Sequence, residues 1–262
     1  MHERSEGTVP FFDAAIYDAF FERVIDYEKQ ADQIAAVLSE RGLNSVIELG
    51  CGTGTLLIHL AKRGFCCLGV DLSDTFLLEA KKKATVANVS VRFIKADITK
   101  LRINEKFDAA VCLRVPLSPR DIRSTLDAIY DHLNTNGVLI MEFLVFNDTA
   151  PKYWSREWPN PFTTLKIIEH GEKHVVKITS FHLYKDRIAV TPVYLWDERG
   201  LLQLSTFNYS LWPIPLDQIR AILSETGFTL VNTLFIEIES VPGADGYVLL
   251  AEKMPRWRST CN

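Results

Sequence analysis

Three glycines at alternate positions, Gly50, Gly52 and Gly54, are the residues whose spacing most directly indicates binding chemistry. They follow an apolar run at 45–49 and precede a helical pattern, which predicts a turn between a strand and a helix. Glycine lets the backbone of such a turn approach a ligand closely, and the start of the helix offers unpaired N–H groups. Asp71 ends the next expected strand, where a carboxylate can accept hydrogen bonds from both hydroxyls of a ribose. The pattern predicts a site for a nucleotide-type ligand.

Glu48, two residues before the first glycine, indicates the charge of that ligand. A dinucleotide-binding turn has the spacing G-x-G-x-x-G and binds a pyrophosphate at the helix start, whereas the spacing here is G-x-G-x-G. A carboxylate beside a pyrophosphate is electrostatically unfavourable, and a carboxylate beside a cation is favourable. S-adenosylmethionine carries a sulfonium and an ammonium group. We therefore expect this cofactor, with S-adenosylhomocysteine as its product.

Alternating strand and helix patterns position these residues. Repeated β-α units of this length predict a parallel sheet that is covered by helices on both faces. Before them, apolar spacings of three and four over 11–41 predict one long helix or two adjoining helices. The expected strands cover 45–49, 65–70, 89–94, 107–113 and 137–146, and the expected helices cover 55–63, 74–87 and 120–134.

The pattern changes after Phe146. An aromatic loop that contains Trp154 and Trp158 is expected over 147–162. Short turns between the strand candidates that follow predict an antiparallel sheet. These strand candidates cover 165–169, 175–184, 187–196 and 201–211, and a helix at 216–226 and a hairpin of strands at 228–239 and 247–252 close the chain.

The glycine segment resembles motif I of the class I S-adenosylmethionine-dependent methyltransferases. Further landmarks of that family occur in order, at Val70-Asp71-Leu72-Ser73, Ala96-Asp97-Ile98, Phe107-Asp108-Ala109-Ala110-Val111 and Leu133-Asn134-Thr135-Asn136-Gly137. The resemblance implies an α/β fold with a Rossmann-like seven-stranded sheet. That sheet is mostly parallel with a C-terminal antiparallel hairpin, and an antiparallel β insertion lies over the active site.

The resemblance also implies which residues bind the cofactor. Residues of the glycine turn would line the methionine and ribose, with Glu48 beneath the amino end and Asp71 at the ribose hydroxyls. Asp97 would accept a hydrogen bond from the adenine amine, although a turn cap is a common role for Asp and is the alternative. The full expected set is Tyr17, Tyr27, Glu48, Gly50, Cys51, Gly52, Gly54, Asp71, Leu72, Phe76, Asp97, Ile98, Leu113 and Arg114.

The segments 16–20 and 26–28 resemble the opening of small-molecule methyltransferases, including amino-sugar and amine N-methyltransferases. In that group a helix and its tyrosine cover the pocket, and Tyr17 and Tyr27 hold the matching positions. Alternatively, Tyr27 belongs to the apolar stripe of its helix, and Tyr17 lies on the helix surface. The resemblance implies N-terminal lid helices over 1–41, a methyltransferase core over 42–146 and 214–254, a β insertion that covers the substrate over 147–213, and a tail over 255–262.

Methyl transfer from a sulfonium is an in-line displacement, so the protein must mainly position the acceptor and exclude water. A base is needed only when the acceptor must lose a proton. Strand ends face the ligand crevice of an open α/β sheet, which makes Arg114 and Glu142 candidates. We expect Tyr17, Arg114 and Glu142 to position the acceptor. The aromatic residues of the insertion suit a flat or cationic acceptor, or they simply pack the sheet.

These observations favour a methyltransferase that acts on a nitrogen or oxygen of a small molecule. The alternatives are a methyltransferase of RNA or protein, an NAD(P)-dependent oxidoreductase, and a fold member without catalysis. A net charge of −4, from 29 basic and 33 acidic residues, shows no basic excess for nucleic acid. The densest basic run, Lys81-Lys82-Lys83, is interpreted as a solvated helix face.

Composition is that of a folded chain, with 47% hydrophobic and 24% charged residues among 262. There is no run of 18 apolar residues and no apolar stretch at the N-terminus, so we expect neither a membrane span nor a signal peptide. The five cysteines show no metal-binding spacing, so we expect no metal site and a reducing, cytoplasmic location. We expect a monomer or a homodimer with no membrane or nucleic-acid partner.

Overall fold

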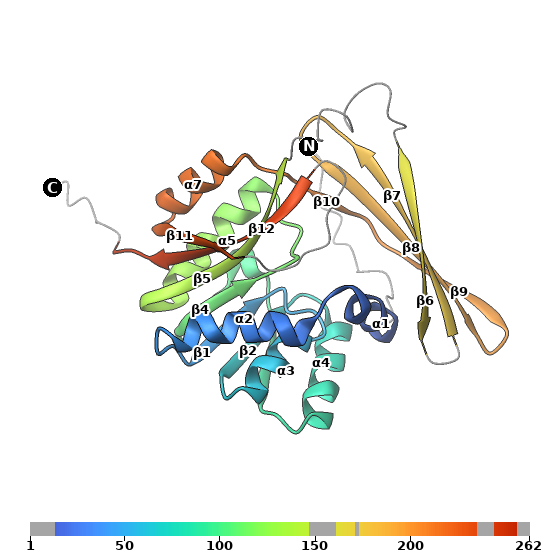
Figure 1. The fold of residues 1–262 in the computed structure, drawn as a ribbon, viewed down its shortest axis with the longest axis horizontal. Helices are drawn as coiled ribbons and strands as arrows, with labels where there is room; N and C mark the ends of the chain where they lie inside the picture. Colours follow the sequence, from blue (N-terminus) through green and yellow to red (C-terminus); the bar gives the residue numbers. More distant parts are fainter. Residues whose placement is uncertain (1–13, 147–160, 171–172, 235–243, 256–262) are drawn as a thin grey trace.

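A seven-stranded sheet forms the centre of the structure, a computed structural model that describes residues 14–146, 161–170, 173–234 and 244–255 (Figure 1). The strand order is β11-β12-β5-β4-β1-β2-β3. Strand β12 runs antiparallel to both of its neighbours, whereas the other pairs are parallel. This confirms the expected fold class. The strands are β1 (Ser45–Leu49), β2 (Cys66–Asp71), β3 (Val91–Lys95), β4 (Phe107–Cys112), β5 (Leu133–Phe146), β11 (Phe228–Leu234) and β12 (Ala244–Lys253).

Helices cover both faces of this sheet because its strands are apolar on both sides. On β1, Ile47 and Leu49 pack in one core cluster with α5 and α7, while Val46 packs on the opposite side against α2, α3 and α4. Figure 1 shows these two layers on either side of the sheet. The helices are α2 (Tyr27–Ser39), α3 (Thr55–Lys62), α4 (Asp74–Val86), α5 (Pro119–His132) and α7 (Leu216–Glu225), with a 3₁₀ turn η1 (Ile98–Lys100).

The N-terminal helical pattern is two helices, α1 (Ala14–Val24) and α2, rather than one. The break falls at Asp26, whose side chain accepts a hydrogen bond of 2.9 Å from the Lys29 N–H. A carboxylate at this position satisfies a backbone donor at the start of α2, which stabilises a new helix start. The chain can therefore change direction here, so that α1 leaves the core while α2 packs on it.

A second, antiparallel sheet follows the core strands. Its order is β10-β8-β7-β6, and β9 also pairs with β8. The strand expected over 201–211 is two strands, because β9 pairs with the second half of β8 and β10 with its first half. The strands are β6 (Phe162–His170), β7 (Lys173–Leu183), β8 (Ile188–Glu198), β9 (Leu201–Thr206) and β10 (Tyr209–Leu211).

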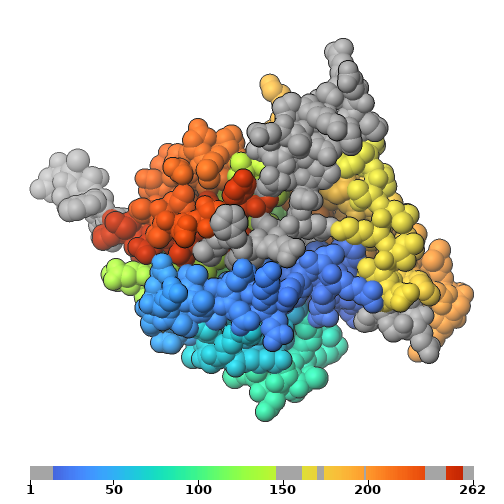
Figure 2. Space-filling view, in the orientation of Figure 1, coloured from blue at the N-terminus to red at the C-terminus, as the bar shows by residue number. Residues whose placement is uncertain are grey.

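Helix α1 joins the second sheet to the core. Ile16 and Phe20 pack in a cluster with Tyr194 of β8, and the Phe20 and Tyr194 rings lie edge to face with centroids 6.1 Å apart. Arg23 donates a hydrogen bond to the backbone oxygen of Glu169 on β6. Figure 2 shows the surface of α1 in contact with the yellow surface of β6. The second sheet is thus fixed above one edge of the core by α1.

Parts of several sequence predictions lie outside the described residues, namely 1–13 of the expected lid helices, 147–160 of the aromatic loop with Trp154 and Trp158, and 256–262 of the tail. The domain boundaries stay predictions. No described helix is long and apolar enough to cross a membrane. No group of three or more side chains that could hold a metal ion occurs in the described part of the chain.

The two ends of α3 offer a matched test of packing around the sheet. A Cβ at Gly54, before the helix, would lie 2.8 Å from the Phe93 ring, whereas a Cβ at Gly64, after it, would meet nothing within 4 Å. Both residues have positive φ. We expect Gly54→Ala to lower the free energy of unfolding by about 2 kcal/mol more than Gly64→Ala, because only the first also overpacks the core. Urea denaturation measures the free energy of unfolding of both variants. Equal losses in the two would contradict the tight packing of Gly54 against Phe93.

Candidate active site at the carboxyl edge of the core sheet

A cavity of about 380 Å³ lies between the carboxyl ends of the core strands, α1 and the second sheet. The expected site residues Tyr17, Gly50, Gly52, Asp71 and Phe76 line it, as do Arg114 and Glu142. The opposite wall comes from the second sheet and the segment after it. The residues of that wall are Lys177, Pro192, Tyr194, Phe207, Tyr209, Leu211, Trp212 and Ile214.

The three glycines of the turn after β1 all have positive φ. The surroundings of their Cα atoms differ. A Cβ at Gly50 would clash with Val115 of the segment that follows β4. Gly54 lies against Phe93 and does not line the cavity. A Cβ at Gly52 would meet no protein atom within 4 Å, and this residue lines the cavity. Gly52 is therefore the glycine that leaves room for a ligand.

Asp71 holds the glycine turn in place. Its Oδ2 accepts a 2.9 Å hydrogen bond from the Gly52 N–H, and its Oδ1 accepts a 2.8 Å hydrogen bond from the Ser73 N–H. Burial raises the pKa of Asp71, although these two backbone bonds oppose the shift. A carboxylate oxygen can accept more than one hydrogen bond, so both oxygens retain capacity for ligand hydroxyls.

Glu48 is a buried acid beneath the turn. Its side chain is only 4% exposed, and Oε2 has no hydrogen-bond partner among the described residues. Burial raises the pKa of Glu48 to about 8, against the opposing charge of Arg114. A buried acceptor without a donor is costly unless a ligand supplies one. This residue therefore fits a ligand with a positively charged donor, as S-adenosylmethionine has in its amino group.

Arg114 and Glu142 meet where β4 and β5 end. The Arg114 N–H donates a 2.8 Å hydrogen bond to Glu142 Oε2, and Arg114 has a φ of +58°, which is uncommon for a residue with a side chain. Burial raises the pKa of Glu142, although the charge of Arg114 opposes this. The guanidinium lies over the Tyr27 ring, 5.3 Å from its centroid, and both terminal nitrogens lie 3.4 Å from Gln30 Oε1. Sequence reasoning missed Gln30, a residue that is 3% exposed.

The two tyrosines of the N-terminal helices occupy different places. The ring of Tyr17 lines the cavity, with centroid distances of 4.4 Å to Phe21 and 4.9 Å to Phe76. Burial raises the pKa of the Tyr17 hydroxyl. Tyr27 packs against the core beneath Arg114, and burial raises its pKa to about 12. Of the two orientations considered for Tyr17, the structure has the one that faces the cavity.

Eight of the expected cofactor residues do not line this cavity, namely Tyr27, Glu48 and Gly54, described above, and Cys51, Leu72, Asp97, Ile98 and Leu113. Asp97 caps η1 and accepts hydrogen bonds from Thr99, of 2.9 Å from its N–H and 2.6 Å from its hydroxyl, which is the alternative role considered for it. The side chain of Leu72 is exposed. The other three are buried, namely Cys51, Ile98 and Leu113. The cofactor contacts of all fourteen expected residues stay predictions.

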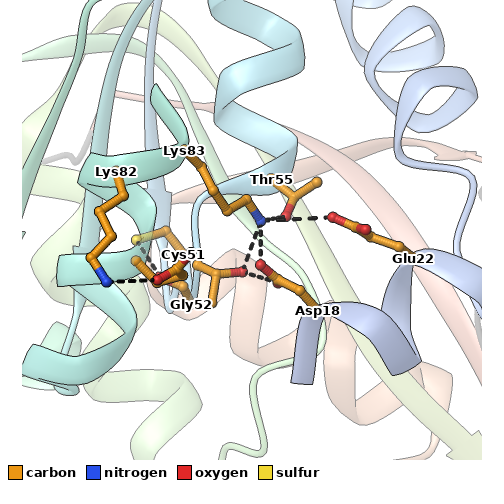
Figure 3. Close-up of polar contacts among 9 residues, drawn as sticks. Asp18, Glu22, Cys51, Gly52, Thr55, Lys82 and Lys83 are labelled. Atoms are coloured by element: carbon orange, nitrogen blue, oxygen red, sulfur yellow. Dashed lines mark hydrogen bonds and ion pairs between the residues drawn. The ribbon is translucent and has the colours of Figure 1, made fainter. Parts of the chain in front are cut away.

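A polar cluster of Asp18, Thr53, Thr55 and Lys83 ties α1 to the glycine turn (Figure 3). Lys83 Nζ lies 2.5 Å from Asp18 Oδ2 and 2.6 Å from Thr55 Oγ1. Thr53, within the turn, donates its hydroxyl hydrogen bond to Asp18. The interpretation of Lys81–Lys83 as a solvated face is wrong for Lys83, because α1 packs over this end of α4. The helix that carries Tyr17 is thereby fixed to the turn.

Comparisons with known proteins agree with this geometry. Residues 46–137 match the family model described as a methyltransferase domain. A Geobacillus protein named as a methyltransferase is 34% identical over 106 residues, which are 39% of this chain and 43% of that protein. This chain thus spans less than half the length of that relative. A glycine/sarcosine N-methyltransferase of Parasynechococcus marenigrum is 27% identical over 90% of this chain and 83% of its own length.

The fold has solved counterparts as well. The sugar N-methyltransferase KedS8 from Streptoalloteichus superposes with a TM-score of 0.70 at 22% identity, covering 97% of this chain and all of that chain. Residues 46–137 therefore form a methyltransferase domain, and the seven-stranded sheet has the fold of S-adenosylmethionine-dependent methyltransferases.

We expect the affinity for S-adenosylhomocysteine, which also carries an ammonium group, to depend on Glu48 and pH. The pKa of about 8 means that Glu48 is mostly protonated at pH 6.5 and mostly ionised at pH 8.5. Binding of a cation favours the ionised form, so the Kd should fall by roughly tenfold or more over this range as the ionised fraction of Glu48 rises. Glu48→Gln should bind more weakly at pH 8.5 and lose this dependence. Calorimetric titration measures the Kd of the wild type and of Glu48→Gln at each pH. A pH dependence that persists in Glu48→Gln would contradict the proposed contact between Glu48 and the ammonium group.

A second prediction concerns the Asp18 cluster. We expect Asp18→Asn to lower the free energy of unfolding by about 1–3 kcal/mol, since it removes one partner of a mostly buried ion pair. S-adenosylhomocysteine should also bind several-fold more weakly, because Thr53 loses a charged acceptor. Glu79→Gln is the matched control, because Glu79 pairs at 3.2 Å with Lys82, whose side chain is 61% exposed. It should change stability by less than about 1 kcal/mol. Equal effects of the two variants would refute the role of the cluster.

Proposed function

We propose that the chain transfers the methyl group of S-adenosylmethionine to a nitrogen, or else an oxygen, of a small molecule that binds in the cavity. The position of the cavity carries this proposal. Gly52 and Asp71 line its core side, and aromatic residues of the second sheet line the other. A volume of about 380 Å³ is within the range of small-molecule sites.

Four residues are proposed to hold the cofactor. Gly52 leaves space for the ligand and Gly50 lines the cavity beside it, Glu48 receives the ammonium group, and Asp71 receives the ribose hydroxyls. When bound, the cofactor would supply a methyl group attached to a sulfonium, whose sulfur would become a neutral thioether once the methyl group is transferred. The protein itself then needs to orient the acceptor and keep water away from the reacting atoms.

Glu142 is the residue best placed to manage the proton of an amine acceptor. It lines the cavity, and its Oε2 accepts a hydrogen bond from the Arg114 backbone, which leaves Oε1 for the acceptor. A carboxylate here attracts an ammonium group, and burial raises its pKa toward a value suited to accepting the proton. Tyr17 and Phe21 of α1 cover the cavity beside it.

Two observations support an amine over a macromolecule. The relative from Parasynechococcus marenigrum is named for methylation of glycine and sarcosine, both small amines. In addition, α1 and the second sheet stand over the carboxyl edge of the core, where a polynucleotide or protein would need access. The matched methyltransferase domain does not favour the oxidoreductase alternative.

The test is formation of S-adenosylhomocysteine from S-adenosylmethionine with a panel of small amines. We expect turnover with at least one of them, and a fall in kcat of at least about 100-fold in Glu142→Gln, the usual size of a general-base contribution. The Kd for S-adenosylhomocysteine should stay within about twofold, because Gln keeps the oxygen that accepts from Arg114. Turnover of RNA or protein with no amine turned over would overturn the proposal.

A further inference from the structure

Lys177 places a positive charge on an otherwise uncharged wall of the cavity. It lies on β7 and is only 8% exposed, yet it lines the cavity. The other described residues that line the cavity from the second sheet and the segment after it are aliphatic, aromatic or proline. Lysine is seldom this buried in proteins, and here its ammonium group gives the described part of this wall its charge.

Aromatic rings hold the Lys177 ammonium at the wall. Its Nζ lies 3.8 Å from the ring centroid of Phe20, 5.5 Å from that of Phe21 and 5.6 Å from that of Tyr194. Such cation–π contacts replace part of the lost hydration and restrict the side chain. Phe21 and Tyr194 themselves line the cavity, so the ammonium is held next to the space that a ligand would occupy.

The opposite wall has different electrostatics. Its acids are Asp71 and Glu142, while the cationic end of Arg114 lies over Tyr27 and beside Gln30. The cavity therefore offers a carboxylate on the core side and an ammonium on the side of the second sheet. A molecule with an amine at one end and an anionic group at the other matches both walls.

We propose that Lys177 binds an anionic group of the methyl acceptor, so that the acceptor is an amine that also carries a carboxylate or a phosphate. This inference rests on the proposed function, because it takes the cavity to be the acceptor site. It makes Lys177 a residue that determines specificity, with Glu142 at the reacting amine and Lys177 at the far end of the acceptor.

The experiment compares matched acceptors on Lys177→Met, Lys177→Arg and Lys166→Met. Lys166 is the control, because it pairs with Lys177 in the strand register and lies 5.7 Å from the Phe20 ring centroid, but is exposed. The acceptors are sarcosine and its neutral amide, and N-methylethanolamine and its phosphate ester. The sarcosine pair tests a carboxylate, and the ethanolamine pair tests a phosphate.

We expect the wild type to favour one charged acceptor over its neutral partner. Lys177→Met should raise the KM of that acceptor by at least about tenfold, the usual cost of a lost charged hydrogen bond, and change the neutral one by less than about threefold. Lys177→Arg should retain most of the preference, and Lys166→Met should retain all of it. A loss of thermal stability with equal effects on charged and neutral acceptors would show that Lys177 only supports packing.

A binding assay keeps the inference testable when none of these amines is turned over. Anilinonaphthalene sulfonate is an anionic aromatic probe, and Nile red is a neutral one. We expect Lys177→Met to raise the Kd of the sulfonate by at least about fivefold and to leave that of Nile red unchanged. This pattern without turnover would remove the proposed function and keep the anion site. Equal changes for both dyes would overturn the anion site.

Discussion

The hydrogen bonds of the Asp71 carboxylate to Gly52 and Ser73 are the constraint on which the site depends. They join the loop after β1 to the loop after β2, so that two neighbouring strand ends present one continuous surface. With Gly52 fixed in its left-handed conformation, the space around its Cα remains open, and the buried Glu48 lies on β1, two residues before the turn. Loss of this carboxylate would free the turn and remove a ligand contact at the same time.

Two buried acids are the second feature of this edge of the sheet. Glu48 and Glu142 both have raised pKa values because they are buried, and Arg114 offsets their charge only in part. The Arg114 backbone adopts a positive φ at the point where its N–H donates to Glu142. Conformations and pKa shifts of this kind are costly in an isolated fold, and they are typical of functional sites.

Helix α1 connects three parts of the molecule. Phe20 enters the core of the second sheet, Asp18 binds Lys83 and the glycine turn, and Tyr17 lines the cavity between them. Because these residues are neighbours on one helix, a shift of α1 changes the cavity wall, the turn and the position of the second sheet together. The proposed acceptor site and the proposed cofactor site thus share one structural element.

The sequence by itself determined the features that depend on local spacing. Alternating apolar runs gave the strands and helices, and the glycine spacing with Asp71 gave the strand-turn-helix site, because these signals are contained within a few residues of the chain. Tertiary structure alone decided the roles of Gln30, Lys83 and Lys177. Each lies on a helix or strand whose periodicity is satisfied whether the side chain faces solvent or another element. These side chains face inward only because of tertiary packing. Gln30 is covered where α2 packs beneath Arg114, Lys83 where α1 packs over α4, and Lys177 where the second sheet packs over the edge of the core.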